Sequence, residues 1–299
     1  MSAAPPLTVA RRFAGAIEPL TGQVYFSPEC HAAYEGLGFG PPLLAPTGLA
    51  LPNGPAYFTS RGSVMGQVRG DVVTAAFGVF NPEVVTPGVT FGWTLTNADT
   101  ICAARDAGAL GQLRRVLGEP AGLARAGELL DRMVAPLTPE GRPLFAGLHG
   151  LAVPDDAFGK VWRQGDRLRE YRGDSHIAAW VSAGLDPIEI GLLTEPYWGL
   201  PVKTYVRSRG WSEQQLDHGI DRLCIRGFLD AEHVLTPDGR AFREAIEDTT
   251  DTSMTAAMAA LGDDADELLA LLTPWGTAVR AANGYPSSGP KDVADATKG

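Results

Sequence analysis

Cysteine is scarce in this sequence, and long apolar runs are absent. Cys30, Cys102 and Cys224 lie far apart and form no CxxC or Cys/His cluster, which argues against a disulfide framework and against a zinc site. No stretch approaches the roughly 20 apolar residues that a membrane helix needs, and residues 1–12 lack the pattern of a signal peptide. We therefore expect a cytoplasmic protein with reduced thiols and no membrane contact.

Basic residues are outnumbered. The 299 residues include 25 Lys and Arg against 35 Asp and Glu, which gives a formal net charge of -10. Proteins that bind nucleic acid usually carry a basic excess or a basic stripe, because neutralising phosphates supplies most of their affinity. The charge balance therefore disfavours duplex DNA as a partner without excluding it.

Several signatures of enzymes are also missing. The sequence has no GxGxxG after a strand, no P-loop, no GxSxG and no HExxH. Its five histidines are too scattered to define a metal site. We therefore predict no metal and no cofactor, and the sequence leaves open whether the protein is catalytic.

What the sequence does contain is apolar residues at helical spacing. Spacings of three and four predict helices over Leu110–Leu117, Leu123–Ala135 and Ala157–Tyr171. Pro and Gly cluster from Phe39 to Pro55, which predicts an irregular connection. Residues 1–8 and 283–299 are rich in Pro, Ser and Gly, and we expect both ends to be loosely held.

The segment Ser208–Asp248 has the clearest local pattern. Ser212 and Gln215 predict a capping box at the start of a helix, and Gly227 predicts its end. Two short strands, at 228–229 and 233–235, follow around a polar turn. Thr236 and Pro237 then predict the start of another helix. This order of helix, two-stranded wing and helix is that of a winged helix.

This segment resembles the MarR-type regulators, which share a "DRLxxRGxL" stretch followed by "LTPxGRxxR". Here the matching residues are Asp221–Leu229 and Leu235–Arg243. The resemblance implies a winged helix-turn-helix fold and a two-fold dimer, and it says little about function.

A comparison of the chain with itself predicts a second, degenerate copy in the first half. Tyr25 aligns with Tyr171, and His31 aligns with His176, at offsets of 146 and 145. The same alignment pairs 60–62 with 208–210 and 86–88 with 236–239. We interpret this as a tandem duplication, mainly helical, that folds as a MarR-like pseudo-dimer with small β-wings. Chance similarity is the alternative. The expected organisation is residues 9–145 for the first repeat with its connecting helices and 146–282 for the second repeat with its C-terminal helices.

The whole chain also resembles an actinobacterial family of helix-turn-helix proteins. That resemblance implies the fold and no settled activity. It rests on the segments Tyr25–Glu29, Tyr57–Gly62, Phe80–Pro82, Gly141–Phe145, Arg169–His176 and Arg209–Leu216.

The helix that would read DNA has an unfavourable composition. From Ser208 to Asp248 five arginines stand against nine acidic residues, and the wing 230–232 has no Arg or Lys. Carboxylates that face phosphates repel them, although exposed acidic helix faces are also common for purely structural reasons. If the protein does bind DNA, the candidate contacts are Arg209, Gln214, Gln215, His218 and Arg222.

The strongest polar cluster lies near residue 170. We expect one helix to end at Gly173 and another to begin at His176, with Asp174 or Ser175 as its cap. The alternative is that the imidazoles of both repeats, each with a nearby carboxylate, face a cavity between the halves. A buried ion pair between Arg61 and Glu18 is an alternative to a ligand contact. The candidate ligand-binding residues are Glu29, His31, Tyr57, Arg61, Arg172, Asp174 and His176.

Three functions remain open. The first is a small-molecule-binding protein whose DNA-reading surface has decayed, and the second is a ligand-responsive DNA-binding transcriptional regulator. The third is a cofactor-independent enzyme that uses a His/carboxylate pair in the cavity between the repeats. A small-molecule ligand is the expected partner, and the sequence does not settle the oligomeric state.

Overall fold

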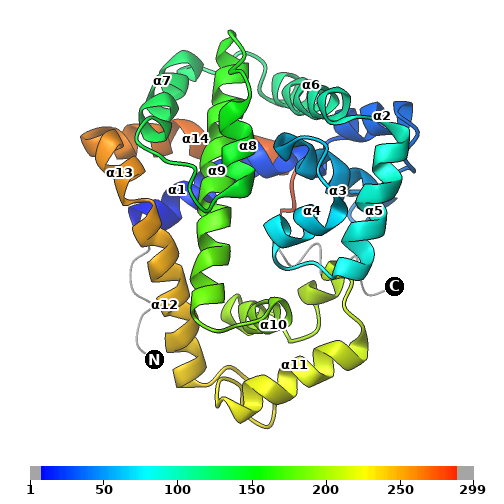
Figure 1. Ribbon diagram of the computed structural model, residues 1–299. Coiled ribbons are helices and arrows are strands. Elements are labelled where there is room, and N and C mark those ends of the chain that lie inside the picture. Colours follow the sequence, from blue (N-terminus) through cyan, green and yellow to red (C-terminus); the bar gives the residue numbers. More distant parts are fainter. Residues whose placement is uncertain (1–7, 288–299) are drawn as a thin grey trace.

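The computed structural model describes residues 8–287, and these residues are mainly helical (Figure 1). A short hairpin, β1 (Leu43–Leu44) and β2 (Ala50–Leu51), joins α2 to α3. The α-helices are α1 (Val9–Gly22), α2 (Pro28–Gly36), α3 (Gly54–Gly62), α4 (Gly70–Phe77), α5 (Pro82–Leu95), α6 (Ala98–Leu117), α7 (Leu123–Val134), α8 (Pro143–Gly150), α9 (Ala157–Ser182), α10 (Pro187–Tyr197), α11 (Glu213–Ile225), α12 (Pro237–Ser253), α13 (Thr255–Leu261) and α14 (Ala265–Ala281). The 3₁₀ turns are η1 (Gln23–Tyr25), η2 (Ser63–Met65), η3 (Tyr205–Arg209) and η4 (Gly262–Asp264).

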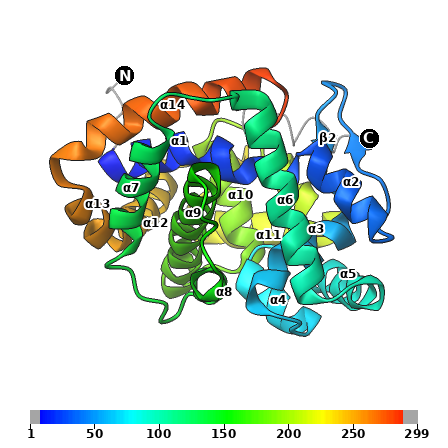
Figure 2. The ribbon, with the colours of Figure 1, turned by 90° about the horizontal axis from the view of Figure 1, so that it is seen from above.

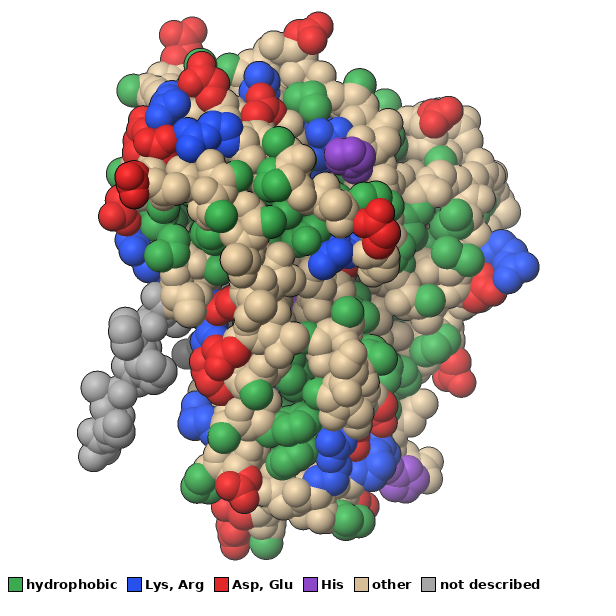
Figure 3. All heavy atoms as spheres, turned by 60° about the vertical axis from the view of Figure 1, so that its left-hand side comes forward, with side chains coloured by type: hydrophobic (Ala, Val, Ile, Leu, Met, Phe, Trp, Pro, Cys, Tyr) green, Lys and Arg blue, Asp and Glu red, His purple; other side chains and the backbone are tan. Residues whose placement is uncertain are grey.

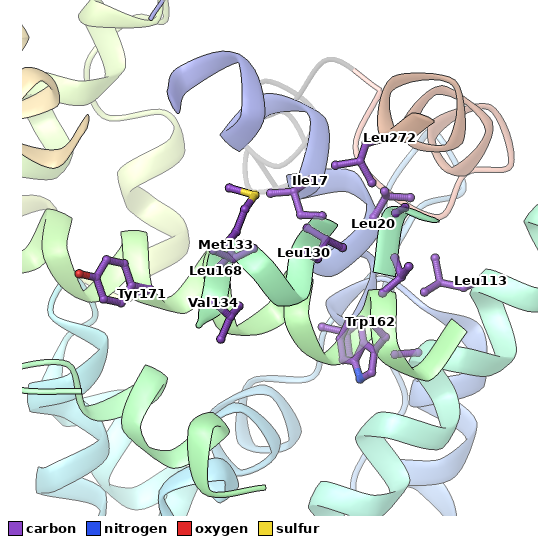
Figure 4. Close-up of a cluster of buried hydrophobic side chains, with 14 of the residues drawn as sticks. Ile17, Leu20, Leu113, Leu130, Met133, Val134, Trp162, Leu168, Tyr171 and Leu272 are labelled. Atoms are coloured by element: carbon purple, nitrogen blue, oxygen red, sulfur yellow. The ribbon is translucent and has the colours of Figure 1, made fainter. Parts of the chain in front are cut away.

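The largest core lies around the first half of α9. Side chains from α1, α6, α7 and α14 pack there with those of α9, and Figure 4 shows ten of them by name. Trp162 is fully buried at its centre. Burial of Leu, Ile and aromatic side chains on this scale is the main stabilising contribution to the fold. This central core therefore unites helices from both ends of the chain.

The helices of the central core pack in an order that the sequence does not suggest. The first helix, α1, lies along the last helix, α14, and α7 lies along α9 (Figure 2). In addition, α2 packs against α6, and α12 packs against α9. Each half of the chain thus supplies helices that cover the other half.

Two smaller cores flank the central one. The first lobe consists of α3, α4, α5 and α8, and its core includes Phe58, Phe77 and Phe80. The second lobe consists of α10, α11, α12 and the C-terminal part of α9, and its core includes Leu192 and Leu216. The helix α9 extends from the central core into the second lobe and so connects them (Figure 1).

The second lobe has the local structure that its sequence predicts. Ser212 and Gln215 form the capping box of α11, and the side chain of Thr236 caps α12. Gly227 has φ = 74°, which glycine adopts without strain. The wing is shorter than predicted, because within the described residues its only ladder contact is the antiparallel bridge between Leu229 and Leu235.

The prediction of a helix break near Gly173 is wrong. The helix α9 is continuous, and neither Asp174 nor Ser175 caps a new helix. Ser175 Oγ donates to the backbone oxygen of Tyr171 one turn earlier, which a helix allows. Asp174 accepts instead from the backbone N–H of Phe145 at the start of α8. Both side chains therefore have partners that leave the helix intact.

The first lobe departs from the predicted wing. Thr86 and Pro87, aligned with the start of α12, lie inside α5. That helix begins earlier because Asn81 caps it, accepting from the N–H of Glu83, and Pro82 occupies its first turn. The connection between Phe39 and Pro55, expected to be irregular, contains the hairpin of β1 and β2 and the start of α3.

The end of the described chain is held more firmly than we expected. Tyr285 donates to Glu18 Oε1 at 3.0 Å and packs edge-on against Phe26. Residues 283–287 are thus docked, and the rest of the predicted loose ends, 1–7 and 288–299, lies outside the described residues. Within 8–287, no single helix has the length and apolar composition of a membrane span. The pair α9 and α10 has that length and composition only when the two helices are taken together, and the chain bends by 107° between them.

Candidate functional site

A partly open cavity lies where the central core meets the two lobes. Its volume is about 320 Å³, and its longest walls are α1 and α9. Trp198, just after α10, lines it from the second lobe, and Arg61 of α3 lines it from the first. We call it the α1–α9 cavity. Its lining residues are Phe13, Ala14, Ile17, Glu18, Arg61, Leu168, Arg169, Glu170, Arg172, Gly173, His176, Trp198 and Met254.

One end of the cavity is an ion-pair network around Glu170. This carboxylate is buried on α9 and accepts from Arg61 Nε at 3.0 Å and Arg61 Nη2 at 2.8 Å. Arg169 Nη1 donates to it at 2.8 Å and also pairs with Glu18. Burial opposes ionisation, but the two arginines outweigh it and lower the pKa of Glu170 to about 2. Glu170 is therefore ionised and fully engaged.

The predicted alternative for Arg61, a buried ion pair, is correct in kind but wrong in its partner. Arg61 pairs with Glu170, and Glu18 pairs with Arg169 instead. Tyr57 lies one turn before Arg61 on α3, and its hydroxyl accepts from Arg61 Nη1 at 3.1 Å. Tyr57 does not line the cavity and packs among aromatic rings of the first lobe.

Arg172 and His176 of α9 also line the cavity, and both contact α12 (Pro237–Ser253). Arg172 Nη2 pairs with Glu247 at 2.9 Å and with Asp251 at 3.1 Å. His176, one turn further along α9, places Nδ1 at 3.0 Å from Thr250 Oγ1. Burial lowers the pKa of His176 to about 4, so that its ring is neutral at pH 7.

Asp174 and His176 do not form the predicted pair. The Asp174 carboxylate faces α8, where it accepts from Phe145 N at 3.0 Å, and burial raises its pKa to about 7. The His176 ring turns toward α12. Successive positions on a helix are about 100° apart, so residues two apart face different directions. Asp174 therefore does not support the His176 imidazole as the predicted general-base pair would require.

The residues that the sequence alignment paired with these two, His31 and Glu29, lie away from the cavity. His31 is buried on α2, and its Nε2 is 3.1 Å from the backbone oxygen of Tyr25. Glu29 pairs with Arg115 on α6 at 2.5 Å. Of the seven predicted ligand-binding residues, the cavity therefore brings together three: Arg61, Arg172 and His176.

The helices α10 and α11 pack against each other in the second lobe, as the two helices of a helix-turn-helix do. Gly219 allows the close approach, because a Cβ there would lie 2.6 Å from Ile188 Cγ2 and 2.8 Å from Leu192 Cδ1. The connection between the helices, residues 198–212, is longer than the turn of three or four residues that usually joins such a pair. Glu195 anchors it by accepting from the backbone N–H groups of Lys203, Thr204 and Val206.

A family model described as a helix-turn-helix family matches residues 10–286 of the chain. The chain belongs to this helix-turn-helix family. No curated protein and no solved structure gives a match. The family match spans both lobes and the central core, and so it covers the α1–α9 cavity as well as α10 and α11.

In this helix-turn-helix protein, α11 has an acidic outer face. Gln214 and His218 are exposed there, whereas Gln215 is used in the capping box. Arg222 pairs with Asp186 and Glu189 on the neighbouring α10 region. Of the five DNA-contact candidates, two therefore lie open to a partner on this face.

Nearby basic side chains are also engaged. Arg209 lies 4.5 Å from the ring centroids of Phe80 and Tyr205. Lys203 pairs with Glu213 and Asp217 on α11. On the face drawn in Figure 3, Lys and Arg side chains are interspersed with Asp and Glu and form no single basic patch.

Sequence reasoning missed the most connected groups of the cavity. Glu170, Arg169 and Trp198 were not among the candidate residues. Thr250 gave no signal at all. An interior Glu within an Arg-rich, otherwise apolar helix face is a signal for a buried network, because a buried carboxylate needs charged partners. That signal identifies Glu170 without naming its partner in α3.

Proposed function

We propose that this helix-turn-helix protein is a small-molecule-binding protein, built as a MarR-like pseudo-dimer whose DNA-reading surface has decayed. The observation that carries the proposal is the α1–α9 cavity. Its apolar wall includes Phe13, Leu168 and Met254, and a few polar groups converge at its ends. This combination is typical of ligand sites.

Helix packing supports the pseudo-dimer. At the offset of 146 residues, α9 corresponds to α1 with α2, and α14 corresponds to α7. Equivalent helices of the two halves exchange partners: α1 of the first half lies along α14 of the second, and α9 of the second half lies along α7 of the first. Such a reciprocal exchange is expected when two subunits of an intertwined two-fold dimer are fused into one chain.

Two equivalent side-chain pairs also support it. Arg61 donates to Tyr57 four residues earlier, and Arg209 donates to Tyr205 four residues earlier. Each arginine also lies 4.5 Å from a phenylalanine ring centroid in the first lobe. The offset between the pairs is 148, close to that of the helices. The shared motif is YxxSRG at 57–62 and 205–210.

The decayed DNA surface is supported by charge. The outer face of α11 offers carboxylates at Glu213, Asp217 and Asp221, and the arginines near it are bound to acidic or aromatic partners. A duplex would have to approach these carboxylates and break such pairs to reach cations.

A cavity-blocking variant tests the binding function. Ala14 lines the cavity, so Ala14→Trp should fill it, whereas Ala178→Trp on the exposed face of α9 should not. We expect small apolar molecules that raise the Tm of the native protein to have no effect on Ala14→Trp and an unchanged effect on Ala178→Trp. Ligands that stabilise both variants equally would show that they bind elsewhere.

The second candidate is a ligand-responsive DNA-binding regulator, and the family match favours it. Fluorescence anisotropy with promoter duplexes at low salt separates the two. The decayed surface predicts no specific binding. Nanomolar affinity for one promoter, lost in a Gln214→Ala/His218→Ala variant, would establish the regulator instead.

A further inference from the structure

The hydrogen bond between His176 and Thr250 determines which ring nitrogen carries the proton. Thr250 Oγ1 donates its own hydrogen to the backbone oxygen of Ile246 at 2.8 Å. With that hydrogen engaged, its oxygen accepts from His176, and we assign the proton of the neutral ring to Nδ1 on this network. Nε2 is left with a lone pair, and within residues 8–287 no protein group donates to it.

Nε2 also remains accessible. His176 lines the α1–α9 cavity and is half-buried. Its Nε2 is not one of the described side-chain polar atoms that are both buried and without a hydrogen-bond partner. The cavity therefore presents one hydrogen-bond acceptor of fixed orientation. Trp198 and Met254 lie on the same lining and offer an apolar surface.

The charged groups of the cavity wall are already neutralised. Arg61 and Arg169 share Glu170, Arg169 also pairs with Glu18, and Arg172 pairs with acidic residues of α12. An ionic ligand would lose its hydration without gaining a counter-ion and would have to displace one of these partners. The wall therefore favours an uncharged ligand.

We propose that the α1–α9 cavity binds an uncharged, mostly apolar molecule of about two fused rings, whose hydroxyl or N–H group donates to His176 Nε2. The size follows from the volume of about 320 Å³, since a cavity of about 150 Å³ holds one benzene ring. This assignment rests on the proposed binding function and names the class of its ligand. His176 is the residue that determines specificity.

Three naphthalene probes test the assignment by calorimetry. The first, 2-naphthol, is uncharged and carries a donor, 2-methoxynaphthalene lacks the donor, and 2-naphthoate carries a negative charge. We expect 2-naphthol to bind about fivefold more tightly than 2-methoxynaphthalene, as one net hydrogen bond predicts. The naphthoate should bind most weakly.

Two variants separate recognition from folding. His176→Phe removes the acceptor and should equalise the affinities of 2-naphthol and 2-methoxynaphthalene. Thr250→Val keeps the shape of α12 but removes the hydroxyl that holds the proton of His176 on Nδ1. It should therefore reduce the preference for 2-naphthol without changing the affinity for 2-methoxynaphthalene. The control His218→Phe, on the exposed face of α11, should leave all three affinities unchanged.

The pH dependence provides an independent readout. The charged groups that face His176 are Arg172 on α9 and Arg243 and Glu247 on α12. Because burial lowers the pKa of His176 to about 4, Nε2 stays unprotonated from pH 8 down to about 5. We therefore expect the preference for 2-naphthol to be constant over that range. A decline centred near pH 6.5, the ordinary pKa of histidine, would contradict the assignment.

The outcomes distinguish the ligand class from the binding function. Equal binding of 2-naphthol and 2-methoxynaphthalene to the native protein, or tighter binding of 2-naphthoate, would overturn the ligand class and leave the binding function standing. No binding of any probe would overturn both. A preference for 2-naphthol that is lost in His176→Phe would establish the assignment.

Discussion

Replacing Glu170 by Gln is expected to lower the free energy of unfolding by about 3 kcal/mol. The carboxylate is 2% exposed and joins α9 to α3 through two bonds from Arg61. It also accepts from Arg169, which has Glu18 as a second partner. The variant would thus leave Arg61 buried without a carboxylate, whereas Arg169 would keep one.

The magnitude follows from two routes. The arginines lower the pKa of Glu170 from 4.5 to about 2, and at 1.36 kcal/mol for each of these roughly 2.5 pKa steps this gives about 3 kcal/mol. Breaking a buried ion pair usually costs about 3–5 kcal/mol. Because the folded-state pKa is lowered, this stabilisation is present above about pH 4.5 and is lost as the pH falls toward 2.

Urea unfolding at pH 7, with Tm as a second readout, measures the effect. For a chain of 299 residues, a loss of about 3 kcal/mol corresponds to a Tm lowered by roughly 5 °C. Arg61→Met should cost less than Glu170→Gln, because Glu170 would keep Arg169. Asp71→Asn, in an exposed pair with Arg69, is the matched control and should have no measurable effect. The reasoning is refuted if Glu170→Gln is as mild as this control, or milder than Arg61→Met.

Two further predictions concern packing and pH. Gly108→Ala on α6 would place a Cβ 2.5 Å from Cys30 Sγ, next to the α2 backbone, and should lower the free energy of unfolding by about 2 kcal/mol. The control Gly111→Ala meets only the flexible Glu29 side chain and should leave the stability unchanged. Equal Tm values for the two variants would contradict this prediction. Burial raises the pKa of Glu195 to about 7, so its contribution to stability is present below about pH 4.5 and lost as the pH rises through 7. The stability of the native protein relative to Glu195→Gln should therefore fall between pH 5 and 8 in urea titrations, and a constant difference would exclude the titration of Glu195.

Local signals in the sequence predicted the second lobe well. The capping box of Ser212 and Gln215, the helix end at Gly227 and the cap at Thr236 are all properties of neighbouring residues, and the structure confirms them. The same reasoning failed at Gly173, where a polar run was interpreted as a helix boundary. Asp174 is satisfied by Phe145, a contact between two helices that local pattern does not reveal.

The cavity was only partly predictable for the same reason. Arg61 and Glu170 are 109 residues apart, and His176 and Thr250 are 74 apart. Their pairing depends on how α3 and α12 pack against α9, and a periodic pattern says which face of a helix is buried without saying against what. The alignment of His31 with His176 predicted equivalent positions, but His176 lines the cavity and His31 does not.

The exchange of helices between the two halves also affects how the chain is made. The helix that covers α1 is α14, which is synthesised long after it, so the first half of the protein leaves the ribosome with an uncovered apolar face. Other chains commonly complete their N-terminal domain during translation. Here Ile17 and Leu20 gain their full cover only when Leu272 has been translated, which delays completion of the central core until both lobes have been synthesised (Figure 4).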